Sequence, residues 1–328
     1  MSVARGPQAA PEATPPRRTP SVRRTTTHDF TRPAGLDGPV HAVAIGRDLS
    51  TDADGRAAVL GASRLEVDVD FSNGVITHVT AQPADPTLAA LVGVTTFRGF
   101  RAALDLALPD ERTRGTVRGQ LLDDLPMTTL LSGRVLRAVG IGLPRRDPKG
   151  ALPVDICAGW VADGTLISGM TAFGPPLHVG PVADEVESER DRLGWHEHDA
   201  LPPNSTRRRR RLDVWRAGDI GAAECFFRDS HVDAEGVETV VHEYTVSATV
   251  DPATLRIVEC DAIPGPLPYP ECPAAAGSAR RLPGEPVDGL RGAVLTDLTG
   301  PTTCTHLNDA FRSLEDVVHL LQLLPASG

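Results

Sequence analysis

A chain of 328 residues is long enough for one large domain or two smaller ones with a real hydrophobic core. Its net charge of −10 argues against a protein that binds nucleic acid or another polyanion. No apolar run approaches the roughly 18 residues that span a bilayer, so we predict no membrane segment. Five cysteines without the spacing of a disulfide framework predict reduced thiols and a cytoplasmic protein.

The chain begins with a segment of low complexity, followed by predicted strands and helices. Residues 1–22 are rich in proline, alanine and arginine, and we predict a disordered tail there. Residues 23–144 are expected to form strands and then helices. Within them, "RLEVDVDF" (64–71) alternates apolar and polar residues, which is typical of a half-buried strand.

Residues 145–206 are rich in proline, glycine and acidic residues, and we predict a partly ordered connector. His196 and His198 lie in this segment, where we expect a solvated loop rather than a ligand pair. Five consecutive arginines, Arg207–Arg211, follow the connector. A basic run most often lies on a solvated face, which is our prediction here, and the alternative is an anion contact near a site.

Residues 207–328 repeat the organisation of residues 23–144. An ungapped offset of 181 places Val40–Pro83 over Gly221–Pro264, and 12 of the 44 positions are identical, including Asp48/Asp229, Gly55/Gly236 and Pro83/Pro264. The predicted fold class is α+β with an internal duplication. Each half is expected to be a small antiparallel sheet packed with helices.

The two halves differ in polar chemistry where helices are expected to begin. Asp85, followed by a proline, aligns with Cys272, also followed by a proline. Proline favours the first helical position, so Asp85 and Cys272 are the predicted N-caps. Cysteine is a poor cap, but a helix N-terminus lowers the pKa of a thiol and favours the thiolate.

The last helix of the second half brings a second thiol and an imidazole. It is predicted from the recurrence of Leu307, Phe311, Leu314, Val318 and Leu321 at helical spacing. Cys304 and His306 lie at its start. The aligned residues of the first half are Arg118 and Gln120, which predicts a structural first half and a chemically active second half.

Two thiols and one imidazole predict a site for a soft or borderline cation. Three ligands are too few for a closed tetrahedral site, and strand alternation makes His242 the best further ligand. The predicted metal ligands are therefore Cys272, Cys304, His306 and His242, holding zinc, iron or an iron–sulfur cluster. Weaker candidates are Asp309, Cys260 and Asp261, whereas Cys157 and Cys225 are predicted core residues.

Two other functions stay open at this point. One is a thiol-dependent enzyme acting on a carbonyl or thioester, with Cys272 or Cys304 as the nucleophile and His306 as a base. The other is a non-catalytic assembly protein that docks through its sheets. The partners that these alternatives imply are another protein or a small anionic ligand.

Several stretches of the second half carry a family resemblance: "RRLDVWR", "FRDS", "VHEYTVSATVDPATLRI", "PYPECPAAAGSARRL" and "CTHLNDAFRSL". Together they resemble the bacterial family known as domain of unknown function 2889, which brings no settled activity. The layout is also similar to that of NifU-type iron–sulfur scaffold proteins, which implies a transferable cluster. Those proteins use three cysteines and place the histidine before the last one, whereas the order here is Cys304-x-His306.

Overall fold

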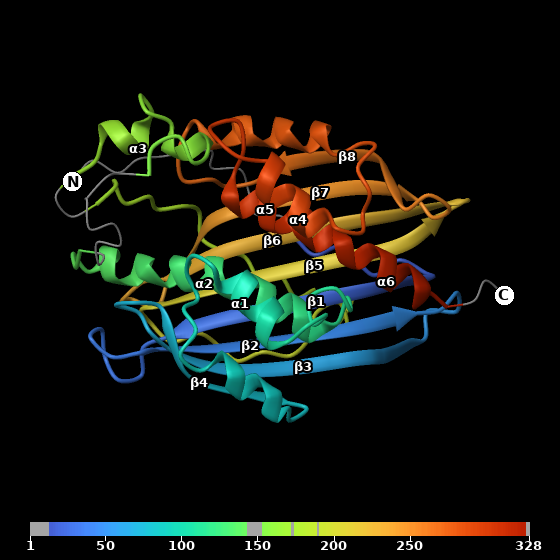
Figure 1. The fold of residues 1–328 in the computed structure, drawn as a ribbon, viewed down its shortest axis with the longest axis horizontal. Coiled ribbons are helices and arrows are strands. Elements are labelled where there is room, and N and C mark those ends of the chain that lie inside the picture. Colours follow the sequence, from blue (N-terminus) through green and yellow to red (C-terminus); the bar gives the residue numbers. More distant parts are fainter. Residues whose placement is uncertain (1–12, 143–152, 172–173, 189, 326–328) are drawn as a thin grey trace.

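The computed structural model of the protein describes residues 13–142, 153–171, 174–188 and 190–325. Its centre is one antiparallel sheet of eight strands, in the order β4-β3-β2-β1-β5-β6-β7-β8 (Figure 1). The predicted α+β class is confirmed. The sequence predicted one small sheet in each half, but β1 pairs with β5 and joins both sets of strands into a single sheet.

Each half contributes four consecutive strands joined by short turns. In the first half they are β1 (Ser21–Thr31), β2 (Val40–Thr51), β3 (Ala57–Asp70) and β4 (Val75–Gln82). In the second half they are β5 (Ser205–Ala217), β6 (Ile220–Val232), β7 (Glu238–Asp251) and β8 (Arg256–Pro264). The predicted tail of residues 1–22 lies outside the described residues as far as residue 12, and β1 already includes its last two residues.

Helices follow the strands in each half and cover one face of the sheet (Figure 1). After β4 these are η1 (Pro86–Leu91), α1 (Phe100–Ala107) and α2 (Val117–Ala138). The connector adds η2 (Ala158–Trp160) and α3 (Thr165–Ser168). After β8 come η3 (Cys272–Arg281), α4 (Leu290–Asp297), α5 (Thr305–Ser313), η4 (Leu314–Asp316) and α6 (Val317–Gln322), so the predicted last helix is interrupted by a tighter turn.

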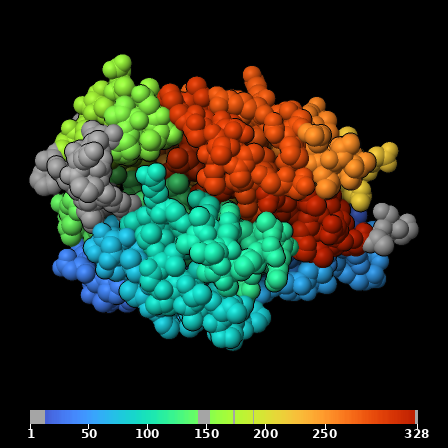
Figure 2. All heavy atoms as spheres, in the orientation of Figure 1, coloured from blue at the N-terminus to red at the C-terminus, as the bar shows by residue number. Residues whose placement is uncertain are grey.

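The helical face is a continuous surface built from three parts of the chain. Figure 2 shows the helices of the first half in cyan, the connector in green and the helices of the second half in orange to red. Two hydrophobic clusters lie beneath, one in each half. Phe100 and Leu121 are fully enclosed in the first, and Phe227 and Phe311 in the second. None of the helices in the described residues is long and apolar enough to cross a bilayer.

The two sets of strands pair in matching registers. Val40 faces Val69 between β2 and β3, and Gly221 faces Val250 between β6 and β7, which is the same pairing moved by the 181-residue offset. Register shifts follow Asp48 in one half and Asp229 in the other. A β-bulge of this kind increases the local twist of the strands and is a specific feature of a fold. The two halves therefore share a detail of strand geometry as well as an order of elements.

The arginine run lies in the middle of the sheet, in β5. None of Arg207–Arg211 is more than 3% exposed, so the prediction of a solvated face is wrong. Buried guanidinium groups need carboxylate partners, and these come from segments far away in the sequence. Arg207 pairs with Asp29, and Arg210 pairs with Asp124 of α2.

The segment of the connector around His196 lies against the sheet face opposite the helices. His196 is 5% exposed, and its ring nitrogens lie 2.8 Å from Thr25 Oγ1 and 3.0 Å from Thr27 Oγ1 of β1. The prediction of a solvated loop is therefore wrong for His196. The neighbouring His198 has its ring nitrogen Nε2 2.5 Å from Glu187 Oε1.

Candidate metal centre

Three elements of the second half bring a carboxylate and two imidazoles together. Asp229 of β6, His242 of β7 and His306 of α5 each present one ligand atom, and these atoms lie within 4.8 Å of one another. Asp229 Oδ2 is 3.5 Å from His242 Nδ1 and 3.8 Å from His306 Nε2. The two rings stack, with centroids 3.7 Å apart and planes inclined by 20°.

Strand register and helix start explain this convergence. Asp229 and His242 are directly paired across β6 and β7, at the point where the register shifts. The helix α5 begins after the sequence "TGPTT", with Cys304 as its extended N-cap, so His306 lies in the first turn. The loop before α5 thereby delivers His306 onto the paired residues of the two strands.

Asp229 is held as an anion by a buried arginine. Arg208 donates from Nε to Oδ1 at 2.6 Å and from Nη2 to Oδ2 at 2.9 Å, and it reaches Asp309 with Nη1 at 2.8 Å. Burial opposes ionisation, but Arg208 outweighs it and holds the pKa of Asp229 well below its ordinary value. The carboxylate is therefore charged at neutral pH, with a fixed orientation.

Both imidazoles of the centre are neutral at physiological pH. Burial lowers the pKa of His306 to about 3, and it also lowers the pKa of His242. The two side chains are 18% and 12% exposed. His242 Nδ1 is a buried nitrogen without a hydrogen bond in the described part of the chain, which is costly unless a partner binds there.

Residues 206–319 match a family of proteins of unknown function, DUF2889. The matched region extends from β5 into α6 and contains Asp229, His242 and His306. This confirms the resemblance seen in the sequence of the second half. No curated protein and no solved structure matches the chain, so the likeness to NifU-type scaffolds has no support.

Two of the four predicted ligands of the DUF2889 region meet in the structure. His242 and His306 lie together, and the third member of their group is Asp229, which sequence reasoning did not select. Arg228-Asp229 in the second half matches Arg47-Asp48 in the first, and a dipeptide present in both halves indicates a structural ion pair or a turn. Asp229 does form an ion pair, with Arg208, and the two histidines beside it distinguish the second half.

Cys272 and Cys304 are not members of this group of three. Both are buried in the hydrophobic cluster of the DUF2889 region, and Cys304 is 5% exposed. Burial, with neighbouring thiols as a further cause, raises the pKa of Cys304 to about 12 and raises that of Cys272. The expectation that helix starts lower these pKa values is wrong, because removal from water outweighs the helix dipole.

The structure adds Cys157 to the neighbourhood of the two predicted thiols. Burial raises the pKa of Cys272, and the thiols of Cys304 and Cys157 contribute to that rise. Tyr244 lies beside them, and its hydroxyl donates to the carbonyl oxygen of Cys272 at 3.2 Å. Cys157 had been predicted as a core residue, and it is 7% exposed, as expected.

The remaining weaker candidates lie outside this group of three. Asp309 pairs with Arg208 at 2.8 Å and with Arg312 at 2.6 Å, so both of its carboxylate oxygens are used within the buried network. Cys260 lies in β8, and burial raises its pKa to about 12. Cys225, a predicted core residue, is fully buried between Arg210 and Ser313.

The first half repeats the arginine–aspartate pair without the histidines. Arg24 donates to both oxygens of Asp48 at 2.7 Å and reaches Asp316 at 2.8 Å, as Arg208 does with Asp229 and Asp309. The residue that faces Asp48 across the strands is Gly61, where the second half has His242. The charged pair is therefore common to both halves, and the imidazoles are confined to the DUF2889 region.

Proposed function

We propose that the protein binds one divalent metal ion through His242, His306 and Asp229. The observation that carries this proposal is the convergence of three ligand atoms within 4.8 Å from three separate elements. Two neutral imidazoles and one carboxylate are a donor set that zinc and ferrous iron both accept.

The separations fit a metal with little rearrangement. Bonds of about 2.0–2.1 Å in a tetrahedral site imply ligand atoms roughly 3.3 Å apart. The two contacts of Asp229 Oδ2, at 3.5 and 3.8 Å, are close to that value.

Asp229 supplies an anionic ligand atom at this place. Asp229 remains ionised, and Arg208 holds it in position by two hydrogen bonds, in the manner of an outer partner that orients a metal ligand. Three protein ligands leave a coordination position open, as in sites that bind water or an oxygen substrate. A metalloenzyme and a metal carrier would both use this arrangement.

Sulfur ligation by Cys272 and Cys304 is the second candidate, and it includes an iron–sulfur cluster. Its support is the proximity of their thiols to each other and to Cys157. Metal-binding cysteines act as thiolates, and the raised pKa of Cys304 makes loss of its proton costly. The same argument weighs against the thiol-dependent enzyme, and for this reason we base the proposal on nitrogen and oxygen ligands.

Metal content of purified variants tests the proposal. Apoprotein prepared with a chelator is dialysed against zinc or, without oxygen, against ferrous iron, and bound metal is measured per chain. We expect one ion in the wild type and loss of it in His242→Gln, His306→Gln and Asp229→Asn. His319→Gln is the matched control, since His319 is a half-buried histidine of α6 with no ligand partner in this group.

Two results would refute this assignment. Unchanged metal content in His242→Gln and His306→Gln, with native circular dichroism, removes the nitrogen ligands. Loss of metal in Cys272→Ser and Cys304→Ser, with retention in Asp229→Asn, transfers the site to sulfur.

We also infer that residues 23–144 and 207–328 are related by internal duplication, with residues 145–206 as the connector. The support is the offset of 181 residues, which aligns identical residues and reproduces the strand register. The duplicated Arg24–Asp48 and Arg208–Asp229 pairs make the same three hydrogen bonds. A cytoplasmic location stays a prediction from the cysteine spacing.

A further inference from the structure

A pair of buried polar side chains lies beside the candidate metal centre. Thr206 of β5 and His231 of β6 face each other directly across the two strands. Each is two residues away from a member of the pair Arg208 and Asp229 on the same strands. Side chains alternate between the two faces of a sheet, so Thr206 and His231 point to the same face as that pair. Arg208 binds Asp309 of α5, so this is the face that the helices cover.

Both side chains of this pair have lost contact with water without gaining a hydrogen bond. Thr206 is 0% exposed and His231 is 4% exposed. Neither Thr206 Oγ1 nor His231 Nε2 has a hydrogen-bond partner within the described part of the chain. A buried hydroxyl or ring nitrogen without a partner is costly, and native proteins rarely leave such groups unpaired. The pair therefore indicates a ligand that supplies the missing partner.

Arg134 of α2 adds a buried positive charge near this pair. It is 9% exposed, donates from Nη2 to the carbonyl oxygen of His178, and has no partner for Nε among the described residues. Burial, followed by the charge of Arg137, lowers the pKa of Arg134 to about 10, and no described carboxylate opposes this shift. Burial is the main cause of the lowered pKa values of His231 and His242, and the charge of Arg134 is a further cause of both. The guanidinium therefore acts on both rings.

Backbone contacts of the connector also place Arg134 near the centre. Three residues after His178, which accepts the hydrogen bond of Arg134, the carbonyl oxygen of Pro181 accepts a hydrogen bond from Val240 of β7 at 2.9 Å. Val240 is two residues from the candidate ligand His242. A short connector segment thus links the guanidinium to the strand that carries the centre.

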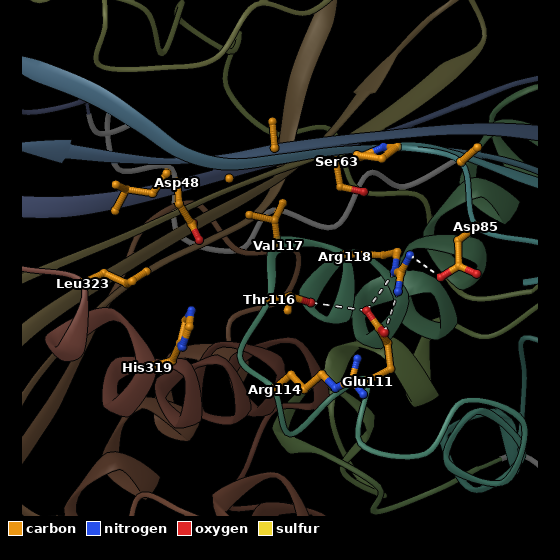
Figure 3. A pocket seen from close by; sticks show the side chains of 15 residues that line it. Asp48, Ser63, Asp85, Glu111, Arg114, Thr116, Val117, Arg118, His319 and Leu323 are labelled. Carbon is orange, nitrogen blue, oxygen red and sulfur yellow. Dashed lines mark hydrogen bonds and ion pairs between the residues drawn. The ribbon is translucent and has the colours of Figure 1, made fainter. Parts of the chain in front are cut away.

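The corresponding place in the first half is built differently. Beside Asp48, Val22 and Ser50 face each other, and the hydroxyl of Ser50 donates to a backbone carbonyl at 3.3 Å. Figure 3 shows Asp48 and His319 of α6 on two sides of a cavity of about 450 Å³. The other two carboxylates of that cavity are paired with Arg118, as the dashed lines in Figure 3 show. Within the described residues, a buried arginine without a carboxylate therefore accompanies the candidate metal centre and not its counterpart.

A carboxylate has the chemistry that these groups lack. Its two oxygens accept hydrogen bonds from a hydroxyl, a ring nitrogen and a guanidinium, and its single negative charge balances Arg134. A water molecule would satisfy Thr206 and His231, but it would leave the charge of Arg134 uncompensated. One positive charge also matches one carboxylate better than it matches a phosphate dianion.

We propose that Arg134, Thr206 and His231 bind the carboxylate group of a small organic acid beside the metal centre. The bound acid is then the candidate substrate, or the second ligand, of the metal ion. This role rests on the proposed function, whereas binding of the carboxylate itself needs only Arg134 and the polar pair. The rings of His242 and His306 are 12% and 18% exposed, so solvent reaches the centre.

Saturation-transfer NMR with acetate on chelator-treated protein tests the proposal. Acetamide is the neutral probe of the same size, and phosphate is measured by its displacement of acetate. We expect acetate to bind saturably, and acetamide and phosphate to bind at least tenfold more weakly. Phosphate binding as tight as that of acetate overturns the assignment to a carboxylate.

Two variants remove the charge and the hydroxyl separately. Arg134→Gln should weaken acetate binding at least tenfold and leave acetamide binding unchanged, and Thr206→Val, which keeps the shape of the side chain, should weaken acetate binding several-fold. Arg56→Gln is the control, because the side chain of Arg56 is 77% exposed. No binding of acetate, equal binding of acetamide, or unchanged acetate binding in Arg134→Gln with native circular dichroism overturns the proposal.

Metal content separates this inference from the proposed function. Arg134→Gln and Thr206→Val keep all three candidate metal ligands, so both should retain one zinc ion per chain. Zinc binding without acetate binding in the wild type refutes the carboxylate site alone. Acetate binding without zinc binding refutes the metal centre alone.

Discussion

Replacing Arg208 by leucine should destabilise the protein by about 3–5 kcal/mol, because it leaves a buried carboxylate without its counter-ion. Arg208 is fully buried and makes two hydrogen bonds to Asp229 and one to Asp309. Asp309 keeps Arg312 at 2.6 Å, so it retains a cation. Asp229 keeps only two neutral imidazoles, and the penalty therefore falls on this one group.

Urea unfolding at pH 7, followed by circular dichroism, measures the loss. A chelator is present throughout, so that bound metal does not add to the stability of the folded state. Arg56→Leu is the surface control. Its guanidinium is 77% exposed beside Asp54, and removal of such a pair costs about 0–1 kcal/mol.

A double variant shows whether the stranded charge is the cause. Arg208→Leu combined with Asp229→Asn removes the charge on both sides and should recover at least half of the lost stability. The reasoning is refuted if Arg208→Leu lowers the free energy of unfolding no more than Arg56→Leu does. It is also refuted if the double variant loses more stability than the sum of the losses in the two single variants.

Three further predictions concern other parts of the molecule. Burial lowers the pKa of His196 to about 3 from an ordinary 6.5, so the folded protein resists protonation of this ring and loses stability as the pH falls below 6.5. Between pH 7 and pH 5, urea unfolding should show that the wild type loses about 2 kcal/mol more stability than His196→Asn. Equal losses in the two proteins would contradict this prediction. All five cysteines are buried and free, so a thiol reagent at pH 7.5 should label none of them before unfolding, whereas rapid labelling of one would revive the thiol-dependent enzyme. An added Cβ at Gly180 would lie 1.9 Å from the carbonyl oxygen of Val240, so Gly180→Ala should lower the free energy of unfolding by about 2 kcal/mol or more. At Gly277 an added Cβ meets no atom within 4 Å, so Gly277→Ala should leave the free energy of unfolding nearly unchanged.

Local sequence rules predicted the strands and the class of the fold well. The alternation of residues 64–71 places Leu65, Val67 and Val69 in the core, as the structure confirms. Asp85 was predicted as an N-cap, and its side chain accepts a hydrogen bond from the backbone of Thr87. These features depend on neighbours within a few residues, and periodicity and capping preferences describe such neighbours directly.

The same rules failed where the partners are distant in the sequence. The arginine run of β5 is typical of a solvated segment by composition alone. Its burial depends on carboxylates such as Asp29 and Asp124, which come 178 and 86 residues earlier in the chain. No local pattern could show those pairs.

Sequence reasoning named two residues of the candidate centre. His306 was selected because the first half has Gln120 at the aligned position, and His242 was selected because strand alternation turns it to the same face as its apolar neighbours. Asp229 was passed over because Asp48 occupies its place in the first half, and identity between halves was taken to mean a structural role. Comparison of halves detects residues that differ, and it misses a shared residue that gains a second role from new neighbours.

The pairing of β1 with β5 also determines which strands can associate with which. Thr25, Thr26 and Thr27 of β1 face Arg211, Arg210 and Arg209 of β5. If the arginine runs of two β5 strands were paired antiparallel, arginine would face arginine, and like charges directly opposite each other repel. The threonine-rich strand is thus the selective partner for the arginine-rich one. That asymmetry favours pairing of a first half with a second half over pairing of two second halves, even though the halves are similar.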